Sequence, residues 1–147
     1  MARIEKVKDS LLMRIYNVEG TVGFNIQSKR DDVLLVQVLL RMIYPKSNYF
    51  PDGLNKDVSL PPITGHCGIT TSMWISTFQL DQGMAPKMQA NGIVNHARTP
   101  KVRSPITGDF YLIYLLNLIC STRNTSEYLR LMNVGLHPMI FSLGAED

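Results

Sequence analysis

The segment Val33–Ile43 constrains the fold most, because apolar residues cover most of its circumference. They form two stripes at helical spacing, one of Val33, Val36, Leu40 and Ile43 and the other of Leu35, Leu39 and Met42. A helix that is apolar on two sides must be covered on two sides, so we expect it at the centre of the molecule. Asp31 or Asp32 is expected to cap this helix, and Pro45 prevents its continuation.

The residues before this helix also carry apolar side chains at helical spacing, with charged residues between them: Ile4, Val7, Leu11, Leu12 and Ile15. The pattern predicts an amphipathic helix from Ile4 to about Tyr16, ended by Asn17 and Gly20. Because Ile, Tyr and Val also favour extended backbone, a strand through Leu12–Val18 is the alternative.

A second helix is predicted to begin at Thr70 or Thr71, one of which would cap it, and to run to about Leu80. One face of this helix is expected to lie in the core, with Thr71, Trp74, Ile75 and Phe78 at helical spacing. Much of the rest carries hydroxyls and amides without charge. Such a face suits glycan hydrogen bonding and equally suits a desolvated protein interface.

Two more helices are expected towards the C-terminus. The first, Asp109–Ile119, is almost wholly apolar and would be capped by Thr107. The second, Thr125–Val134, would begin at a capping box of Asn124 and Glu127 and end at Gly135. Two long loops, 46–67 and 83–108, complete a mainly α chain.

Composition indicates a single globular unit of 147 residues, 45% hydrophobic and 18% charged, with a formal net charge of +3. The charged N-terminus lacks the apolar run of a signal peptide, and the longest uncharged stretch, Val58–Leu80, contains prolines and glycines that do not suit a membrane helix. We therefore expect a cytoplasmic protein without a membrane span, unless a dedicated machine exports it. Cys67 and Cys120 are expected to be free thiols.

Gln37 and the glycines Gly65 and Gly68 indicate how the first two helices contact each other. Gln37 lies on the apolar stripe of the central helix, where an unpaired amide would cost roughly 1–3 kcal/mol. We therefore expect its amide to bind the backbone of the loop 65–71, and Gln79 to do the same for another loop. Gly65 and Gly68 would permit a tight turn with positive φ before the second helix.

These residues form an ordered pair of motifs: Asp32-Val33, Val36-Gln37 and Leu40, then Gly65-x-x-Gly68-x-x-Thr71-x-x-Trp74-Ile75-x-x-Phe78-Gln79. The pair resembles the peptidoglycan-binding-like domain family. Thr64 and Trp74 stand where that family carries Asp and Ala. The resemblance covers residues 20–99 and implies a small, mainly α helical bundle of the peptidoglycan-binding-domain type. Residues 1–19 would then be an N-terminal helical extension, and residues 100–147 a C-terminal one.

The resemblance implies a non-catalytic module that recognises bacterial cell-wall peptidoglycan. The expected ligand-binding residues are Ser72, Trp74, Ser76, Asn95 and Arg98. Trp74 would then be an aromatic platform for a sugar ring or a partner side chain; the alternative is that it fills the core. The remaining motif residues are structural: Asp32, Val33, Gln37, Leu40, Gly65, Gly68, Thr71, Ile75, Phe78 and Gln79.

The alternative function is a protein–protein interaction module on the same scaffold. It would be an accessory of a type VI-like bacterial secretion machine or of a phage-type assembly. The uncharged second helix and the apolar C-terminal helix favour it. The sequence carries no spacing typical of a metal site, a nucleophilic catalyst or paired catalytic carboxylates, and no nucleic-acid-binding motif. We therefore expect no enzyme activity, no cofactor, no metal and no nucleic-acid partner.

Overall fold

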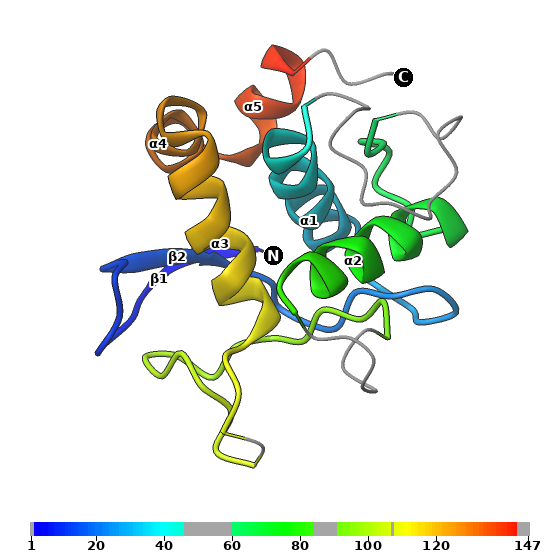
Figure 1. Ribbon diagram of the computed structural model, residues 1–147. Coiled ribbons are helices and arrows are strands. Elements are labelled where there is room, and N and C mark those ends of the chain that lie inside the picture. The colour runs from blue at the N-terminus through cyan, green and yellow to red at the C-terminus, as the bar shows by residue number, and fades with distance from the viewer. Residues whose placement is uncertain (1, 46–59, 84–90, 107, 144–147) are drawn as a thin grey trace.

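The computed structural model describes residues 2–45, 60–83, 91–106 and 108–143 (Figure 1). The described part of the chain contains five helices and one antiparallel sheet of two strands. In chain order these elements are β1 (Arg3–Lys6), β2 (Arg14–Asn17), α1 (Arg30–Ile43), α2 (Ile69–Asp81), α3 (Leu112–Arg123), α4 (Thr125–Val134) and α5 (Leu136–Ser142).

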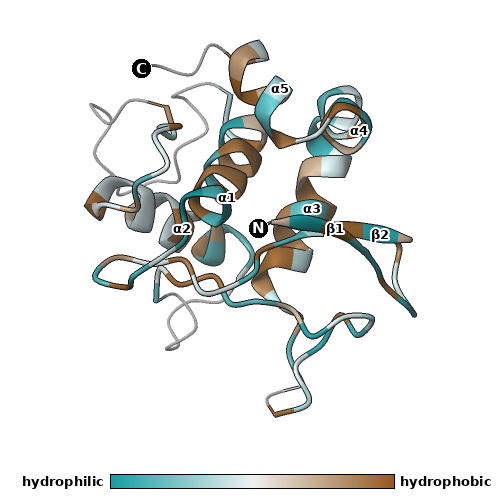
Figure 2. Ribbon diagram, turned by 180° about the vertical axis from the view of Figure 1, so that it is seen from behind, coloured by the Kyte–Doolittle hydropathy of each residue, from teal (hydrophilic) through white to brown (hydrophobic). Residues whose placement is uncertain are grey.

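Helix α1 lies at the centre, as its two apolar stripes predict. Every residue from Asp32 to Leu40 is buried, and α1 contacts α2, α3 and α5. The apolar sides of α1 and α3 face one another in the hydropathy view (Figure 2). The core therefore consists of one buried helix with other helices on more than one side, which is the arrangement that such an apolar helix requires.

Asp32 does not cap α1, contrary to expectation. The helix begins after Lys29, which has extended backbone and makes no side-chain cap bond. The buried Asp32 carboxylate instead accepts hydrogen bonds from the backbone amides of Glu19 and Gly20, each at 2.8 Å. Asp32 therefore anchors the segment that enters from β2 to the first turn of α1.

The N-terminal segment is a β-hairpin, so the predicted helix Ile4–Tyr16 is wrong. Strands β1 and β2 pair antiparallel, with Arg3 opposite Asn17 and Lys6 opposite Arg14. A turn separates the strands, in which Asp9 has a positive φ of 53° and the Ser10 hydroxyl accepts a hydrogen bond from the Leu12 amide. Backbone with positive φ cannot continue a right-handed helix.

Contacts with α3 also favour the extended form of β2. The side-chain amide of Asn117 accepts from the Tyr16 amide at 2.8 Å and donates to the Tyr16 carbonyl at 2.9 Å. These two bonds satisfy the backbone groups at an edge of the sheet. The alternative prediction, a strand through Leu12–Val18, is therefore correct for β2.

The mainly α class expected from the resemblance is also wrong, because the chain combines helices with a two-stranded sheet.

The helix Thr125–Val134 has the predicted bounds, and Gly135 follows it with a positive φ of 92°. Asn124 does not form the capping box; its side chain donates to the Met42 carbonyl at 3.2 Å instead.

The other C-terminal expectations are corrected in detail. Helix α3 begins at Leu112 rather than Asp109 and continues to Arg123. Helix α5 was not expected. Thr107, the predicted cap of α3, lies outside the described residues, as do residues 46–59 and 84–90 of the two expected loops. No helix among the described residues has both the length and the apolar character that a membrane crossing requires.

Candidate functional site

Gln37 joins α1 to the loop before α2, as the sequence predicts. Its Oε1 accepts from the amides of Thr64 and Gly65 at 2.8 and 2.9 Å, and its Nε2 donates to the His66 carbonyl at 3.1 Å and to Thr71 Oγ1 at 3.0 Å. Thr70 and Thr71 both lie inside α2, so neither is its N-cap residue. Both ends of the buried amide are satisfied, so this loop and the start of α2 have a fixed position relative to the core.

The helix α2 begins differently from the prediction. Gly68 is its N-cap residue and has φ −90°, a conformation open to any residue, whereas Gly65 has the expected positive φ of 82°. Ile75 and Phe78 are buried in the core face, as predicted.

Gln79 makes the equivalent attachment at the other end of α2. Its Oε1 accepts from the Gly92 amide at 2.9 Å, and its Nε2 donates to Asn91 Oδ1 at 3.2 Å. The expectation that Gln79 binds a second loop is confirmed. Because both ends of α2 are fastened through buried glutamine side chains, the outward face of the helix is presented in a defined orientation.

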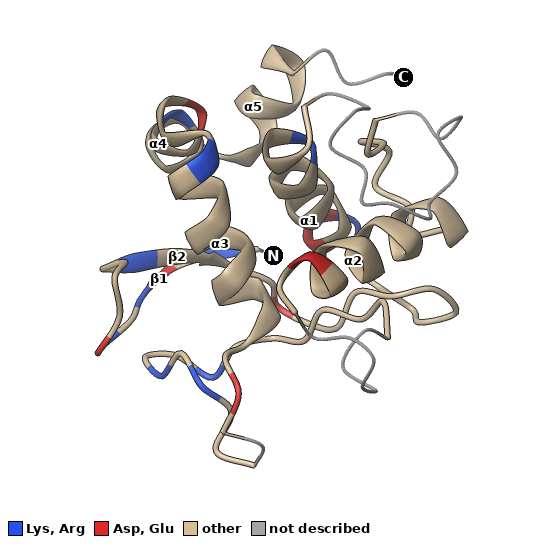
Figure 3. Ribbon diagram, in the orientation of Figure 1, with Lys and Arg blue, Asp and Glu red and all other residues tan. Residues whose placement is uncertain are grey.

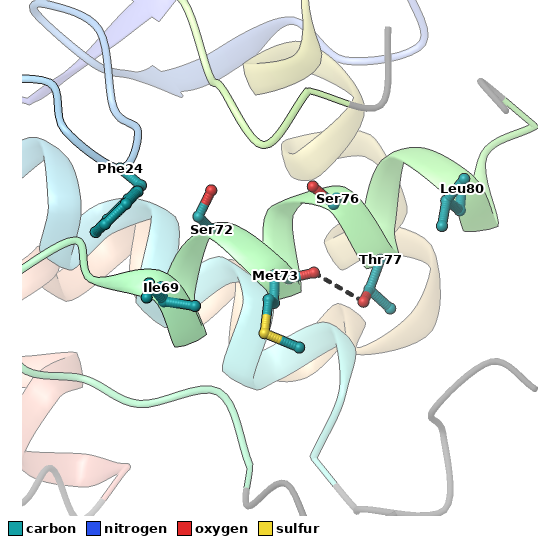
Figure 4. A pocket seen from close by; sticks show the side chains of 7 residues that line it. All are labelled: Phe24, Ile69, Ser72, Met73, Ser76, Thr77 and Leu80. Atoms are coloured by element: carbon teal, nitrogen blue, oxygen red, sulfur yellow. Dashed lines mark hydrogen bonds between the residues drawn. The ribbon is translucent and has the colours of Figure 1, made fainter. Parts of the chain in front are cut away.

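A shallow apolar hollow of about 220 Å³ lies on this outward face (Figure 4). Its lining consists of Phe24, Ile69, Ser72, Met73, Ser76, Thr77 and Leu80. Four of these side chains are apolar and at least 39% exposed: Phe24, Ile69, Met73 and Leu80. We call these seven residues the α2 groove. No charged side chain belongs to its lining.

The two serines line one edge of the α2 groove, pointing away from Ile69, Met73 and Leu80 (Figure 4). Ser72 donates to the Gly92 carbonyl at 3.3 Å. A Cβ atom on Gly92 would collide with Ser72 Oγ and would lie 3.1 Å from both the Ser72 carbonyl and Ser76 Oγ, so Gly92 approaches α2 too closely to carry a side chain. The serine hydroxyls therefore face the 91–94 segment as well as the groove.

Trp74 lies in the core and does not line the α2 groove. The side chain is 1% exposed, and its ring centroid lies 5.2 Å from that of Tyr44. The Tyr44 hydroxyl donates to Asp81 Oδ2 at 2.9 Å. A buried indole cannot stack on a sugar ring in solvent, so the alternative of a core-filling tryptophan describes this residue and the aromatic platform does not.

Asn95 and Arg98 are exposed but lie outside the lining of the α2 groove. Asn95 Oδ1 accepts from the Thr21 hydroxyl at 3.3 Å, beside the bridge that pairs Val22 with Val94. Of the five predicted ligand-binding residues, only Ser72 and Ser76 are thus brought together at one hollow.

The four apolar groove residues Phe24, Ile69, Met73 and Leu80 were not among the predicted site residues, and Phe24 was the hardest of them to predict. It stands alone in a glycine-bearing connection, and nothing in its neighbours indicates a partner. The bridge Val22–Val94 places the connection beside α2, and the two residues come from segments more than 70 positions apart. By contrast, Met73 and Leu80 lie seven residues apart on one side of the predicted helix, a spacing that could have indicated an exposed apolar face. Ile69 joins them because α2 begins earlier than predicted.

The chemistry available near the groove is limited. A second hollow adjoins Phe24 and is lined in part by His66 and Cys67. Burial raises the pKa of the Cys67 thiol, which lowers the fraction of thiolate and so its nucleophilicity at neutral pH. Among the described residues, no three side chains of the His, Cys, Asp and Glu types gather closely enough to hold a metal ion.

Comparison of the chain with protein-family models, with curated proteins and with solved structures found no match. The resemblance to the peptidoglycan-binding-like family therefore stays a hypothesis. What the site can do is argued below from its own geometry.

Proposed function

We propose that this chain is a non-catalytic interaction module that binds an uncharged, apolar segment of a protein partner in the α2 groove. The observation that carries the proposal is the exposure of Phe24, Ile69, Met73 and Leu80 around one hollow without charged lining residues. Exposed apolar side chains that gather at one place are typical of interaction sites, whereas single ones are ordinary.

The charge distribution supports this choice of partner. Helix α2 carries no charged side chain before Asp81, and in Figure 3 its ribbon is uncharged except at the end that holds this residue. A charged partner segment would lose its hydration here without gaining an opposite charge. A segment that presents aliphatic side chains would instead gain from burial, by about 25 cal/mol for each Å² of apolar surface removed from water.

The rigid attachment of α2 also favours binding. Because Gln37 and Gln79 fix the two ends of the helix, the groove exists before the partner arrives, and association does not have to order it. A preformed site loses less conformational entropy on binding than a flexible one.

Peptidoglycan is the competing ligand, and the groove supports it less well. The exposed Asn95 and Arg98 could contact a glycopeptide, but they lie outside the groove, and Trp74 is not available for stacking on a sugar. Four exposed apolar side chains suit a protein surface better than a hydrophilic glycan.

Site-specific photo-crosslinking tests the proposal. A photoreactive residue at Met73 is expected to give one stoichiometric protein adduct in cells of the source organism, and the same residue at the exposed Thr122 on α3 is expected to give none. Adding Ile69→Glu should abolish the adduct, because a carboxylate would have to be buried against the apolar partner. Equal adducts from both positions would contradict the proposal.

A second experiment separates the two ligands. The intact chain is mixed with purified peptidoglycan sacculi, which are then sedimented. We expect no pelleting for the unchanged chain. Pelleting that is lost in Arg98→Glu and retained in Ile69→Glu would overturn the protein-partner proposal in favour of wall binding.

A further inference from the structure

Among the described residues, positive charge is concentrated at one end, formed by the β-hairpin and residues 98–106 and 108–110 (Figure 3). We call this region the basic end. It holds seven cations against three carboxylates: Arg3, Lys6, Lys8, Arg14, Arg98, Lys101 and Arg103, against Glu5, Asp9 and Asp109. Over the rest of the described chain, cations and carboxylates are equal in number. The basic end therefore carries a local positive potential that the formal net charge of +3 understates.

The two parts of the basic end are joined by direct contacts. The Lys8 amide donates to the Pro100 carbonyl at 2.8 Å, and Glu5 Oε1 accepts from the Thr99 hydroxyl at 3.1 Å. A hollow of about 440 Å³ lies at this junction, lined by Lys8, Asp9, Pro100, Lys101, Val102 and Arg103. Three of its six lining residues are cations, so the hollow suits an anionic group such as a phosphate.

Two contacts position the Arg103 guanidinium beside this hollow. Its guanidinium lies 3.8 Å from the centroid of the Phe110 ring, and one of its N–H groups donates to the Gly108 carbonyl at 3.0 Å. A guanidinium has five N–H donors, so one protein bond leaves donors available for an anion. Its prior positioning lowers the entropy lost when an anion binds.

Strongly exposed apolar side chains occur at the same end. Leu11 and Met13 in the hairpin are each 85% exposed, and Ile106 in the loop before α3 is 86% exposed. Among the described residues, the only other large apolar side chain at least 85% exposed is Phe141. The hairpin and the described residues of the loop before α3 (98–106 and 108–110) both project from the helical body, in the front view and from behind (Figures 1 and 2).

We propose that the basic end binds the surface of a bilayer that contains anionic lipids. Lys8, Lys101 and Arg103 contact the lipid phosphates, while Leu11, Met13 and Ile106 enter the boundary between headgroups and acyl chains. Peripheral membrane proteins combine these two features, because charge attracts the protein to the surface and apolar burial retains it there. The proposal concerns a different surface from the α2 groove and does not depend on the function proposed for it.

The apolar side chains distinguish a bilayer from a nucleic acid. A phosphodiester backbone would satisfy the cations, but it offers no apolar layer for three aliphatic side chains on projecting turns. Base stacking requires aromatic platforms, and the aromatic ring near Arg103, Phe110, is already covered by the guanidinium. Charge and apolar exposure together therefore favour the lipid surface.

Co-flotation of the full chain with vesicles tests the proposal. Vesicles of phosphatidylcholine alone are compared with vesicles of phosphatidylcholine and an equal amount of phosphatidylglycerol. We expect flotation with the anionic vesicles only, and less of it at high salt. Lys8→Glu combined with Lys101→Glu should weaken binding at least about tenfold, since each cation near an anionic surface contributes roughly a fivefold factor.

The apolar contribution has its own variants and control. Leu11→Ser with Met13→Ser and Ile106→Ser should weaken binding about tenfold or more, by removing apolar burial. Phe141→Ser removes an equally exposed side chain at α5, away from the basic end, and should leave flotation unchanged. All four positions are exposed, so the variants should keep the circular dichroism of the unchanged chain.

An independent readout reports insertion. Ile106→Trp should shift its emission to shorter wavelength with anionic vesicles, while the buried Trp74 contributes a constant background. The proposal is overturned by equal flotation with neutral vesicles, by no flotation at all, or by serine variants that bind as well as the unchanged chain. Tighter binding of a short DNA duplex, with no emission shift on vesicles, would assign the basic end to nucleic acid instead.

Discussion

The side chain of Gln37 holds Thr64 at two points, donating from Nε2 to the hydroxyl at 3.2 Å and accepting the backbone amide on Oε1 at 2.8 Å. This pair connects the most buried helix to the loop that precedes the α2 groove. A buried amide with all its partners specifies one arrangement, because any other position of the loop would leave polar groups unsatisfied. The position of the groove thus depends on a residue in the core.

Replacing Gln37 by Leu is expected to lower the free energy of unfolding by about 2–4 kcal/mol, because the amides of Thr64 and Gly65 and the hydroxyl of Thr71 lose their partner. Urea unfolding followed by circular dichroism measures the change. Gln27→Leu, at an exposed position, is the control and should stay within about 0.5 kcal/mol. A Gln37→Leu variant as stable as the control would show that the loop does not depend on this side chain.

Trp74→Ala is expected to lower the free energy of unfolding by about 3–5 kcal/mol, the range for a large buried aromatic side chain. The indole is fully buried against Tyr44, and the neighbouring residue Met73 faces the groove. Met73→Ala should therefore cost less than about 1 kcal/mol. Since the substitution removes the sole tryptophan, circular dichroism has to follow the unfolding. Similar losses for the two variants would mean that Trp74 is not a core residue.

The sequence was sufficient for those parts of the fold that depend on local pattern. The two stripes of α1 required a central helix, and Gln37 was predicted to bind a loop because an amide on an apolar stripe needs partners. Gly135 likewise ended α4 at the predicted residue. Each of these inferences depends on one helix and the residues next to it.

The parts that could not be predicted depend on contacts between distant segments. The choice between helix and strand at residues 14–17 is decided by Asn117 on α3, which satisfies the backbone of Tyr16. Asp32 binds Glu19 and Gly20 rather than capping its own helix. The α2 groove includes Phe24 because Val22 pairs with Val94. Tertiary contacts override local propensity at all three places.

Stability is expected to fall as the pH rises above about 8.5, where thiols of an unfolded chain begin to ionise. Burial, with a smaller effect from Glu127, raises the pKa of Cys120 in the folded chain, and burial also raises the pKa of Tyr44 and Tyr128. The folded state therefore keeps protons that the unfolded state loses, and the free energy of unfolding decreases by about 1.4 kcal/mol per pH unit for each such group.

Urea unfolding at a series of pH values, with a reducing agent present, measures this dependence. Cys120→Ala should reduce the slope between about pH 8.5 and 10, the interval in which the thiol titrates before the phenols. Below pH 8 the variant and the unchanged chain should differ by a constant amount. A free energy of unfolding that is independent of pH across the alkaline range would show that these groups are not shielded from solvent.

Gly92→Ala is expected to destabilise the chain and to distort the α2 groove, for two separable reasons. Gly92 has a positive φ of 73°, which costs a residue with a side chain about 1–2 kcal/mol. Its added Cβ would also collide with Ser72 Oγ and press on the Ser72 carbonyl and on Ser76 Oγ. Gly83 has a similar φ of 78° but open space around the same position, so Gly83→Ala carries the backbone strain alone. The difference between the two unfolding free energies therefore measures the steric contact beside the groove. If both variants lose the same stability, the 91–94 segment can move without strain, and its close approach to α2 does not position Ser72 and Ser76 at the edge of the groove.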